Sequence, residues 1–172
     1  MNETIRSLKN RYSTKKYLPR QVEDTLLDAV LEAGLYAPSG LNNQKVIAVA
    51  VRDKKTRDLL SRLNAQVMGA ENDPFYGAPC VIVVLSDPER STWVEDGSLV
   101  LGNMLNAATS LGLGNCWVHR AREVFDSQEG KSLLKEWGLP EHYRGVGNCI
   151  LGYADGEPQI KPRTEGRLIK LD

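Results

Sequence analysis

The feature that most constrains the fold is a run of six consecutive apolar residues, Cys80 to Leu85, directly after the breaker-rich segment 71–79. A strand with one solvated face alternates apolar and polar residues, whereas a strand buried on both faces is apolar throughout. The run therefore predicts a strand in the centre of a sheet.

Segments with helical and strand periodicity alternate around this run. We expect helices over 2–10, 22–36, 53–68, 91–111 and 127–137, and further strands over 46–51, 115–120 and 146–153. Because the chain opens with helices, this order favours an α+β fold over a regular doubly wound one. The chain has 172 residues and no repeat or linker, so we expect a single domain over 1–172.

The formal charge is zero, from 22 basic and 22 acidic residues, but it is unevenly distributed. Residues 1–20 carry a net charge of +5 and residues 159–172 a net charge of +2, so the body between them is acidic. Positive charge this short and local indicates neither a nucleic acid nor a membrane surface as partner.

The sequence also bears on location and metal binding. No run approaches the roughly 20 apolar residues of a membrane span, and the first residues lack the apolar core of a signal peptide. The 3 cysteines have no CxxC spacing, and there are only 2 histidines. We therefore expect a cytoplasmic protein with buried structural thiols and no metal site.

Two basic clusters lie at opposite ends of the chain. In an extended segment, Arg11, Ser13 and Lys15 project to one side. Cations beside a hydroxyl suit a phosphate monoester, although a solvated basic loop is the alternative interpretation. Lys161 and Arg163 are also two residues apart, and with the first cluster they would make a four-cation site.

Two other segments offer weaker signals. Residues 37–44 (APSGLNNQ) carry neutral donors and acceptors that suit the edge of a flat polar heterocycle, or form an Asn-rich turn. Residues 112–119 (GLGNCWVH) lack the GxGxxG spacing of a dinucleotide site. Neither a phosphate-binding P-loop nor a GxSxG nucleophile elbow is present, and no side-chain nucleophile stands out.

Taken in order, these segments resemble the FMN-dependent nitroreductase family in its short bacterial form. The similar segments are RYSTKKY (11–17), LEAGLYAPSGLNNQ (31–44), APCVIVV (78–84), residues 96–118, and LGY with KPR (151–153 and 161–163). The resemblance implies a central mixed sheet sandwiched by helices. It also implies an intertwined homodimer whose C-terminal segment reaches the partner.

The resemblance further implies one FMN at each subunit interface. Its phosphate would be held by Arg11, Ser13, Lys161 and Arg163, with Tyr12 contributing nearby. The phosphate of FMN carries nearly two negative charges, which the two basic chain ends would neutralise.

The flavin ring has its own implied contacts. Lys15 would approach the N1/O2 edge and stabilise the reduced flavin, and Asn64 would reach the pyrimidine edge. The remaining implied contacts are the backbone of Trp117, Val118 and His119 and, from the other subunit, Pro38, Ser39, Gly40 and Asn42.

The implied activity is that of an NAD(P)H oxidoreductase. Flavin N5 would pass a hydride from NADH or NADPH to a nitroaromatic, quinone or similar acceptor in a ping-pong cycle, which requires no side-chain nucleophile.

One departure from the family pattern leaves alternatives open. After Gln44 the family's Pro and two aromatic residues are replaced by Lys45, Val46 and Ala48. A flavin carrier or sensor with little reductase activity is therefore the alternative, followed by a non-flavin nucleotide-binding module. Residues 68–77 are a candidate lid, with Phe75 and Tyr76 as stacking residues.

Overall fold

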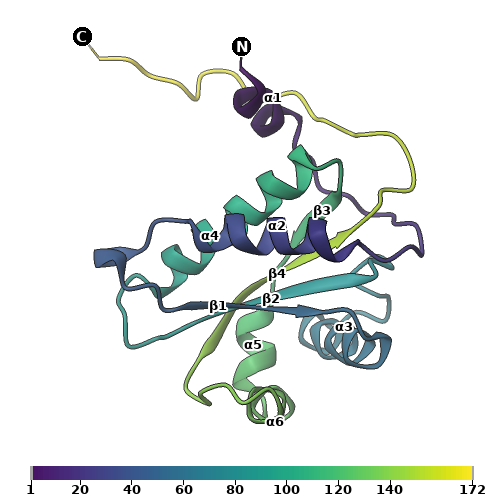
Figure 1. Cartoon of the computed structure of the whole chain (residues 1–172), viewed down its shortest axis with the longest axis vertical. Coiled ribbons are helices and arrows are strands. Elements are labelled where there is room, and N and C mark those ends of the chain that lie inside the picture. The colour runs from purple at the N-terminus through teal and green to yellow at the C-terminus, as the bar shows by residue number, and fades with distance from the viewer. Residues whose placement is uncertain (1, 172) are drawn as a thin grey trace.

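The apolar run forms the central strand, as predicted. In the structure, a computed structural model that describes residues 2–171, β2 (Cys80–Ser86) is buried along its whole length. It lies between β1 (Val46–Val51) and β4 (Arg144–Gly152), and β3 (Gly114–Val118) completes the sheet order β1-β2-β4-β3 (Figure 1).

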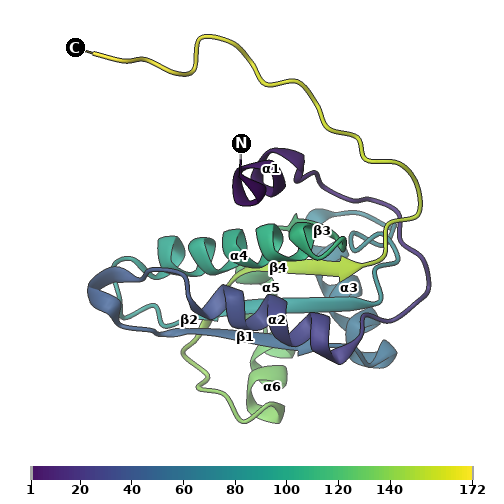
Figure 2. The ribbon, with the colours of Figure 1, turned by 45° about the horizontal axis from the view of Figure 1, so that its top comes forward.

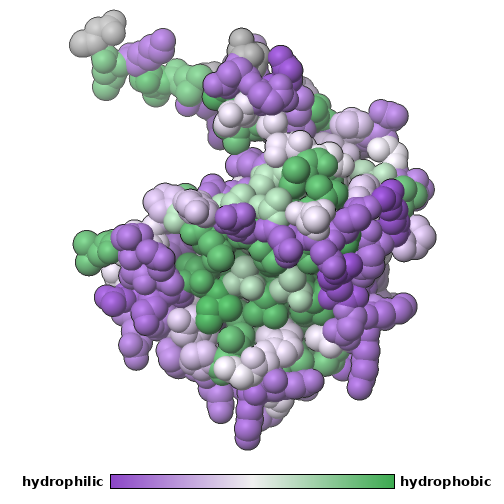
Figure 3. Space-filling model, in the orientation of Figure 1, coloured by the Kyte–Doolittle hydropathy of each residue, from purple (hydrophilic) through white to green (hydrophobic). Residues whose placement is uncertain are grey.

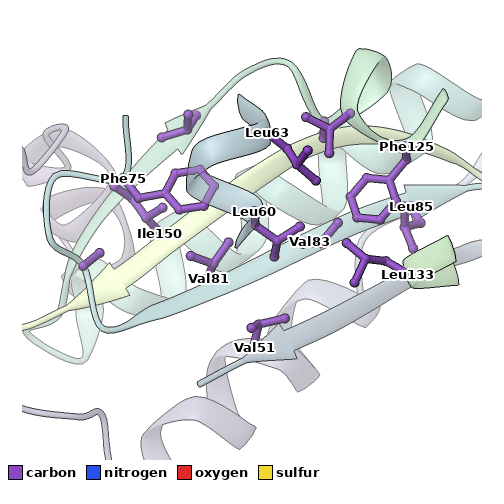
Figure 4. Packing of buried hydrophobic residues seen from close by; sticks show 14 of the residues in the cluster. Val51, Leu60, Leu63, Phe75, Val81, Val83, Leu85, Phe125, Leu133 and Ile150 are labelled. Atoms are coloured by element: carbon purple, nitrogen blue, oxygen red, sulfur yellow. The ribbon is translucent and has the colours of Figure 1, made fainter. Parts of the chain in front are cut away.

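Side chains of β2 alternate between two cores, one on each face of the sheet. On one face, α2 (Asp24–Leu35) and α4 (Trp93–Ser110) cover a core that includes Ile82 and Val84. On the other face, α3 (Lys54–Met68) and two short helices cover the second core, which includes Val81, Val83 and Leu85 (Figures 2 and 4). The predicted sandwich of helices around the sheet is therefore confirmed.

The expectation of a mixed sheet is wrong for the four strands described. Each of the three strand pairs is antiparallel. Residues 69–79 run back along α3, so β2 begins beside the end of β1, and Val51 is the partner of Val81. A helix followed by a returning segment thus makes neighbouring strands antiparallel.

The region after β3 also differs from the expectation. Arg120 has a left-handed backbone with φ of 80°, so the strand ends at Val118 and the chain turns into α5 (Ala121–Asp126). The single helix expected over 127–137 is the second of two, α6 (Gln128–Glu136). The hydroxyl of Ser127 separates them by accepting a hydrogen bond from Gly130 N at 3.1 Å.

The 3 cysteines are free thiols buried in the sheet. Burial raises the pKa of Cys80 to about 12 and also raises that of Cys149, so both stay protonated at neutral pH. Among residues 2–171, no helix combines the length and apolar character that crossing a membrane requires.

Both chain ends lie outside the two cores. The amphipathic α1 (Glu3–Asn10) has no buried residue, and residues 156–171 extend away from the sheet (Figures 1 and 2). Leu168 is 95 % exposed and Leu171 is 93 % exposed. The apolar end of the tail therefore does not pack on its own chain.

Candidate functional site

An extended arm, residues 11–18, follows α1 and crosses the ends of β3 and β4. Backbone hydrogen bonds fix its path: Thr14 N donates to Asn115 O at 2.9 Å, and Leu18 N donates to Tyr153 O at 2.9 Å. The arm is thus held by backbone hydrogen bonds to the sheet edge and by the buried side chains of Thr14 and Tyr17.

Side chains of residues 13–15 alternate between a cavity of about 340 Å³ and the protein interior. Thr14 is 3 % exposed, whereas Ser13 and Lys15 face outward, as the two-residue period predicts. The structure brings the two basic ends of the chain together, because the cavity is lined by Arg11, Tyr12, Ser13, Lys15, Gln159, Ile160, Lys161 and Arg163.

The electrostatics of this cavity favour an anion. Its lining contains four cationic side chains and no carboxylate. A second hollow of about 320 Å³ shares part of this lining and extends to Asp155, whose carboxylate pairs with Lys16 at 2.7 Å. The second hollow also has Glu157 in its lining, but within residues 2–171 none of the four cations of the first cavity forms an ion pair.

The free edge of β3 continues from this cavity. Since Asn115 O accepts from the arm, Asn115 directs its backbone away from β4. In an antiparallel ladder, residues two apart direct their backbone groups to the same side, so Trp117 also directs its N–H and C=O to the free edge. The side chain of Val118 is buried, and His119 beyond the strand end is exposed.

Asn64 lies at the far end of this edge, on α3. It is completely buried, and its Nδ2 donates to His119 O at 2.8 Å. Its Oδ1 is also buried but accepts no hydrogen bond within residues 2–171. An unmatched buried acceptor is costly, so this oxygen requires a donor.

The prediction of two stacking residues in the candidate lid 68–77 is wrong for Phe75. Phe75 is not a stacking residue, because it is fully buried in the core beneath α3 with Leu60 and Leu63 (Figure 4). Tyr76 is half-buried against the same core, and the Lys15 ammonium lies 5.8 Å from the centre of its ring. No residue of 68–77 lines the cavity itself, and the segment is linked to it through the contact of Tyr76 with Lys15.

The loop with Pro38, Ser39, Gly40 and Asn42 is held by a buried carboxylate at the start of α4. Asp96 Oδ1 accepts from Gly40 N at 2.8 Å, and its Oδ2 accepts from Asn43 Nδ2 at 3.1 Å. The left-handed φ of 52° at Asn42 shows that the loop is held in an uncommon conformation.

One chain does not bring this loop to the cationic cavity. The loop, with its 3-10 turn η1 (Gly40–Asn42), and the arm 11–18 lie at opposite ends of the molecule (Figures 1 and 2). The predicted site residues therefore form two separate groups.

Sequence reasoning missed the two acids that hold the site loops. Asp96 lies in the first turn of a helix, yet it is only 3 % exposed. Asp73 lies in the breaker-rich segment and organises the turn around Tyr76. The one available signal is Thr92 four residues before Asp96, whose hydroxyl donates to that carboxylate at 3.1 Å.

The fold and the cavity define an α+β protein with a cation-lined ligand site at the edge of its sheet. A model of the nitroreductase family matches residues 8–153. The chain therefore belongs to the nitroreductase family, which is a family of oxidoreductase enzymes.

Individual relatives agree with this assignment. A nitroreductase with bound FMN from Bacteroides fragilis has 27 % identity and a TM-score of 0.93, with 100 % of both chains covered. A second, from Desulfitobacterium hafniense, also with bound FMN, has 28 % identity and a TM-score of 0.90 at the same coverage. An Archaeoglobus fulgidus protein, provisionally named NADH dehydrogenase/NAD(P)H nitroreductase, is 31 % identical over 91 % of this chain and 88 % of its own length.

Proposed function

We propose that this chain is an FMN-dependent NAD(P)H oxidoreductase that reduces nitroaromatics, quinones or similar electron-poor acceptors. The cavity between residues 11–15 and 159–163 carries the proposal, because four cations meet there without a carboxylate. A phosphate monoester carries 1.5 to 2 negative charges at neutral pH, roughly, and needs such a lining. Two structural relatives contain bound FMN, and another relative is named for NAD(P)H.

A second observation supports the fit of the cofactor. The buried Oδ1 of Asn64 needs a hydrogen-bond donor, and it lies near the end of the β3 edge. The pyrimidine edge of a flavin offers both N–H and C=O groups. Asn64 and the cationic cavity would therefore recognise opposite ends of one long, polar ligand.

The residues of the chain have separate roles in this proposal. FMN, when bound, supplies hydride transfer at N5. Arg11, Lys161 and Arg163 bind the phosphate by charge-assisted hydrogen bonds, and Ser13 adds a directional donor. Lys15 places a positive charge beside the ring and favours its negatively charged forms.

The proposed active unit is a homodimer. Residues 38–42 lie far from the cavity of their own chain, so a second copy would have to supply them. The exposed Leu168 and Leu171 provide an apolar contact for such a copy. Figure 3 shows a broad apolar area on the face that carries α2 and α4, which is the kind of surface that a stable interface covers.

The same site would serve donor and acceptor in turn. Since one cofactor handles both half-reactions, NADH or NADPH would leave before the acceptor enters, which is a ping-pong cycle.

The test starts from purified protein incubated with FMN and desalted. We expect a yellow protein that elutes as a dimer, is bleached anaerobically by NADH or NADPH, and regains its colour with a quinone or a nitroaromatic. A protein that retains no FMN contradicts the proposal. A yellow protein that neither nucleotide bleaches is instead a flavin carrier or sensor.

A further inference from the structure

Tyr76 occupies the middle of a turn in which Asp73 binds every neighbouring backbone amide. The Asp73 carboxylate accepts from Phe75 N at 2.9 Å and from Gly77 N at 2.8 Å. The Asp73 carbonyl accepts from Tyr76 N itself at 3.2 Å. The backbone on both sides of Tyr76 is therefore held by one residue.

Asp73 is in turn anchored to α3. Its carboxylate accepts from Ser61 Oγ at 2.5 Å and from the buried guanidinium of Arg57 at 2.6 Å. Burial raises the pKa of Asp73, but the hydrogen bonds from Arg57, Ser61 and the backbone outweigh it, so the pKa is lowered overall. Asp73 is thus a charged, rigid anchor at neutral pH.

The turn holds Tyr76 in a conformation that a bulky residue rarely adopts. Its φ is 52°, in the left-handed region. A left-handed backbone at a bulky residue costs free energy, and it persists only where the surrounding structure imposes it. Such strained residues are concentrated at functional sites. Here the result is a half-buried tyrosine ring whose centre lies 5.8 Å from Nζ of Lys15, a residue of the cavity lining.

The ammonium groups of Lys15 and its neighbour Lys16 have different partners. Lys16 is paired with the carboxylate of Asp155 at 2.7 Å. Within residues 2–171, Lys15 forms no ion pair, and its ammonium has the Tyr76 ring as its aromatic partner. An aromatic ring restrains an ammonium without cancelling its charge, whereas a carboxylate neutralises it.

We propose that Tyr76 is a positioning residue that holds the Lys15 ammonium in the cavity with its full charge available to the bound cofactor. This inference rests on the proposed function, in which Lys15 lies beside the flavin ring. In this inference the turn 73–77 orients the flexible side chain of Lys15 and does not close over the cavity as a lid.

The experiment compares Tyr76→Phe and Tyr76→Leu in the FMN-loaded protein, each also in a Lys15→Met background. The readout is the equilibrium constant for two-electron reduction of the bound flavin, measured against a reference dye. We expect Tyr76→Leu to lower it roughly two- to fivefold, as for an exposed cation–π pair, and Tyr76→Phe to leave it near the parent value. In the Lys15→Met background, Tyr76→Leu should have no further effect.

Two results would overturn the inference. One is an unchanged equilibrium constant in Tyr76→Leu, and the other is an equal loss with and without Lys15. An independent measurement on the unmodified protein is an NMR cross-peak between the Lys15 ε-methylene protons and the Tyr76 ring protons, whose absence also contradicts the inference. A parent protein that takes up no FMN refutes the proposed function instead, so the two failures are distinguishable.

Discussion

The cationic cavity and the loop 38–44 are both assigned to one cofactor, but the chain holds them by different means. The cavity consists of exposed, flexible cations on two extended segments. The loop presents neutral groups and is held by the buried carboxylate of Asp96. Charge neutralisation requires cations within reach, whereas neutral hydrogen bonds require a fixed geometry. We therefore expect the cavity to contribute mainly to affinity and the loop to contribute mainly to stability.

The largest expected effect tests the loop. Asp96→Ala leaves Gly40 N without its acceptor and removes one of the two acceptors of the half-buried Asn43 amide, and should lower the free energy of unfolding by about 2–4 kcal/mol. The measurement is urea denaturation of the protein without cofactor. Glu95→Ala, one residue away but exposed, is the matched control and should change little. Equal stabilities of the two variants would remove the contrast between loop and cavity.

The next effect tests the cavity. Arg163→Ala removes one charge-assisted contact to phosphate and should weaken FMN binding about 10- to 100-fold, without a measurable change in unfolding. Fluorescence titration with FMN measures it. Arg167→Ala lies on the same segment outside the cavity lining and serves as control. If both variants bind FMN like the parent, the phosphate assignment is wrong.

A smaller effect tests how tightly the loop packs. A Cβ at Gly40 would lie 2.3 Å from Thr92 Oγ1, so Gly40→Ala must displace the threonine. The expected loss of stability is about 1 kcal/mol, at the low end for overpacking, because one side chain can rotate away. Thermal unfolding of Gly40→Ala and of the double variant with Thr92→Ala checks this. The double variant should recover most of the loss, and no recovery would point to a different cause.

The smallest effect tests the turn 73–77, which the carboxylate of Asp73 holds as the carboxylate of Asp96 holds the loop 38–44. The pKa of Asp73 is lower in the folded protein than in the unfolded chain, where it is about 3.9. The ionised carboxylate therefore stabilises the fold at pH values above that unfolded pKa. This contribution should disappear as the pH falls through the folded pKa. The stability difference between the parent and Asp73→Asn, followed from pH 6 downward by urea denaturation, should shrink below about pH 4. A difference that does not change with pH would contradict this.

The sequence predicted most of the fold because long apolar patterns determine burial. The run 80–85 identified the central strand, and the two-residue spacing at 11–15 correctly placed Ser13 and Lys15 on one side. The meeting of residues 11–15 with 161–163 was predicted from charge and from the family resemblance, and the structure confirms that they share a cavity.

Local patterns failed where tertiary contacts decide. The burial of Phe75 follows from Arg57 and α3 above it, which no neighbouring residue reveals. The antiparallel order of β1 and β2 depends on where residues 69–79 return, and α5 is too short for a clear period. Asp96 has the same residue type as an exposed helical acid, and its burial depends on the distant loop that it holds.

The 3 buried thiols allow local unfolding of the native protein to be measured by thiol labelling. A thiol reagent reacts with each cysteine only when its strand is exposed, so labelling rates measure how often each part of the sheet opens. Cys116 is on β3 at the edge of the sheet, whereas Cys80 and Cys149 are on the two inner strands. Mass spectrometry of labelled protein would therefore separate fraying of the β3 edge from unfolding of the whole sheet, without any engineered cysteine.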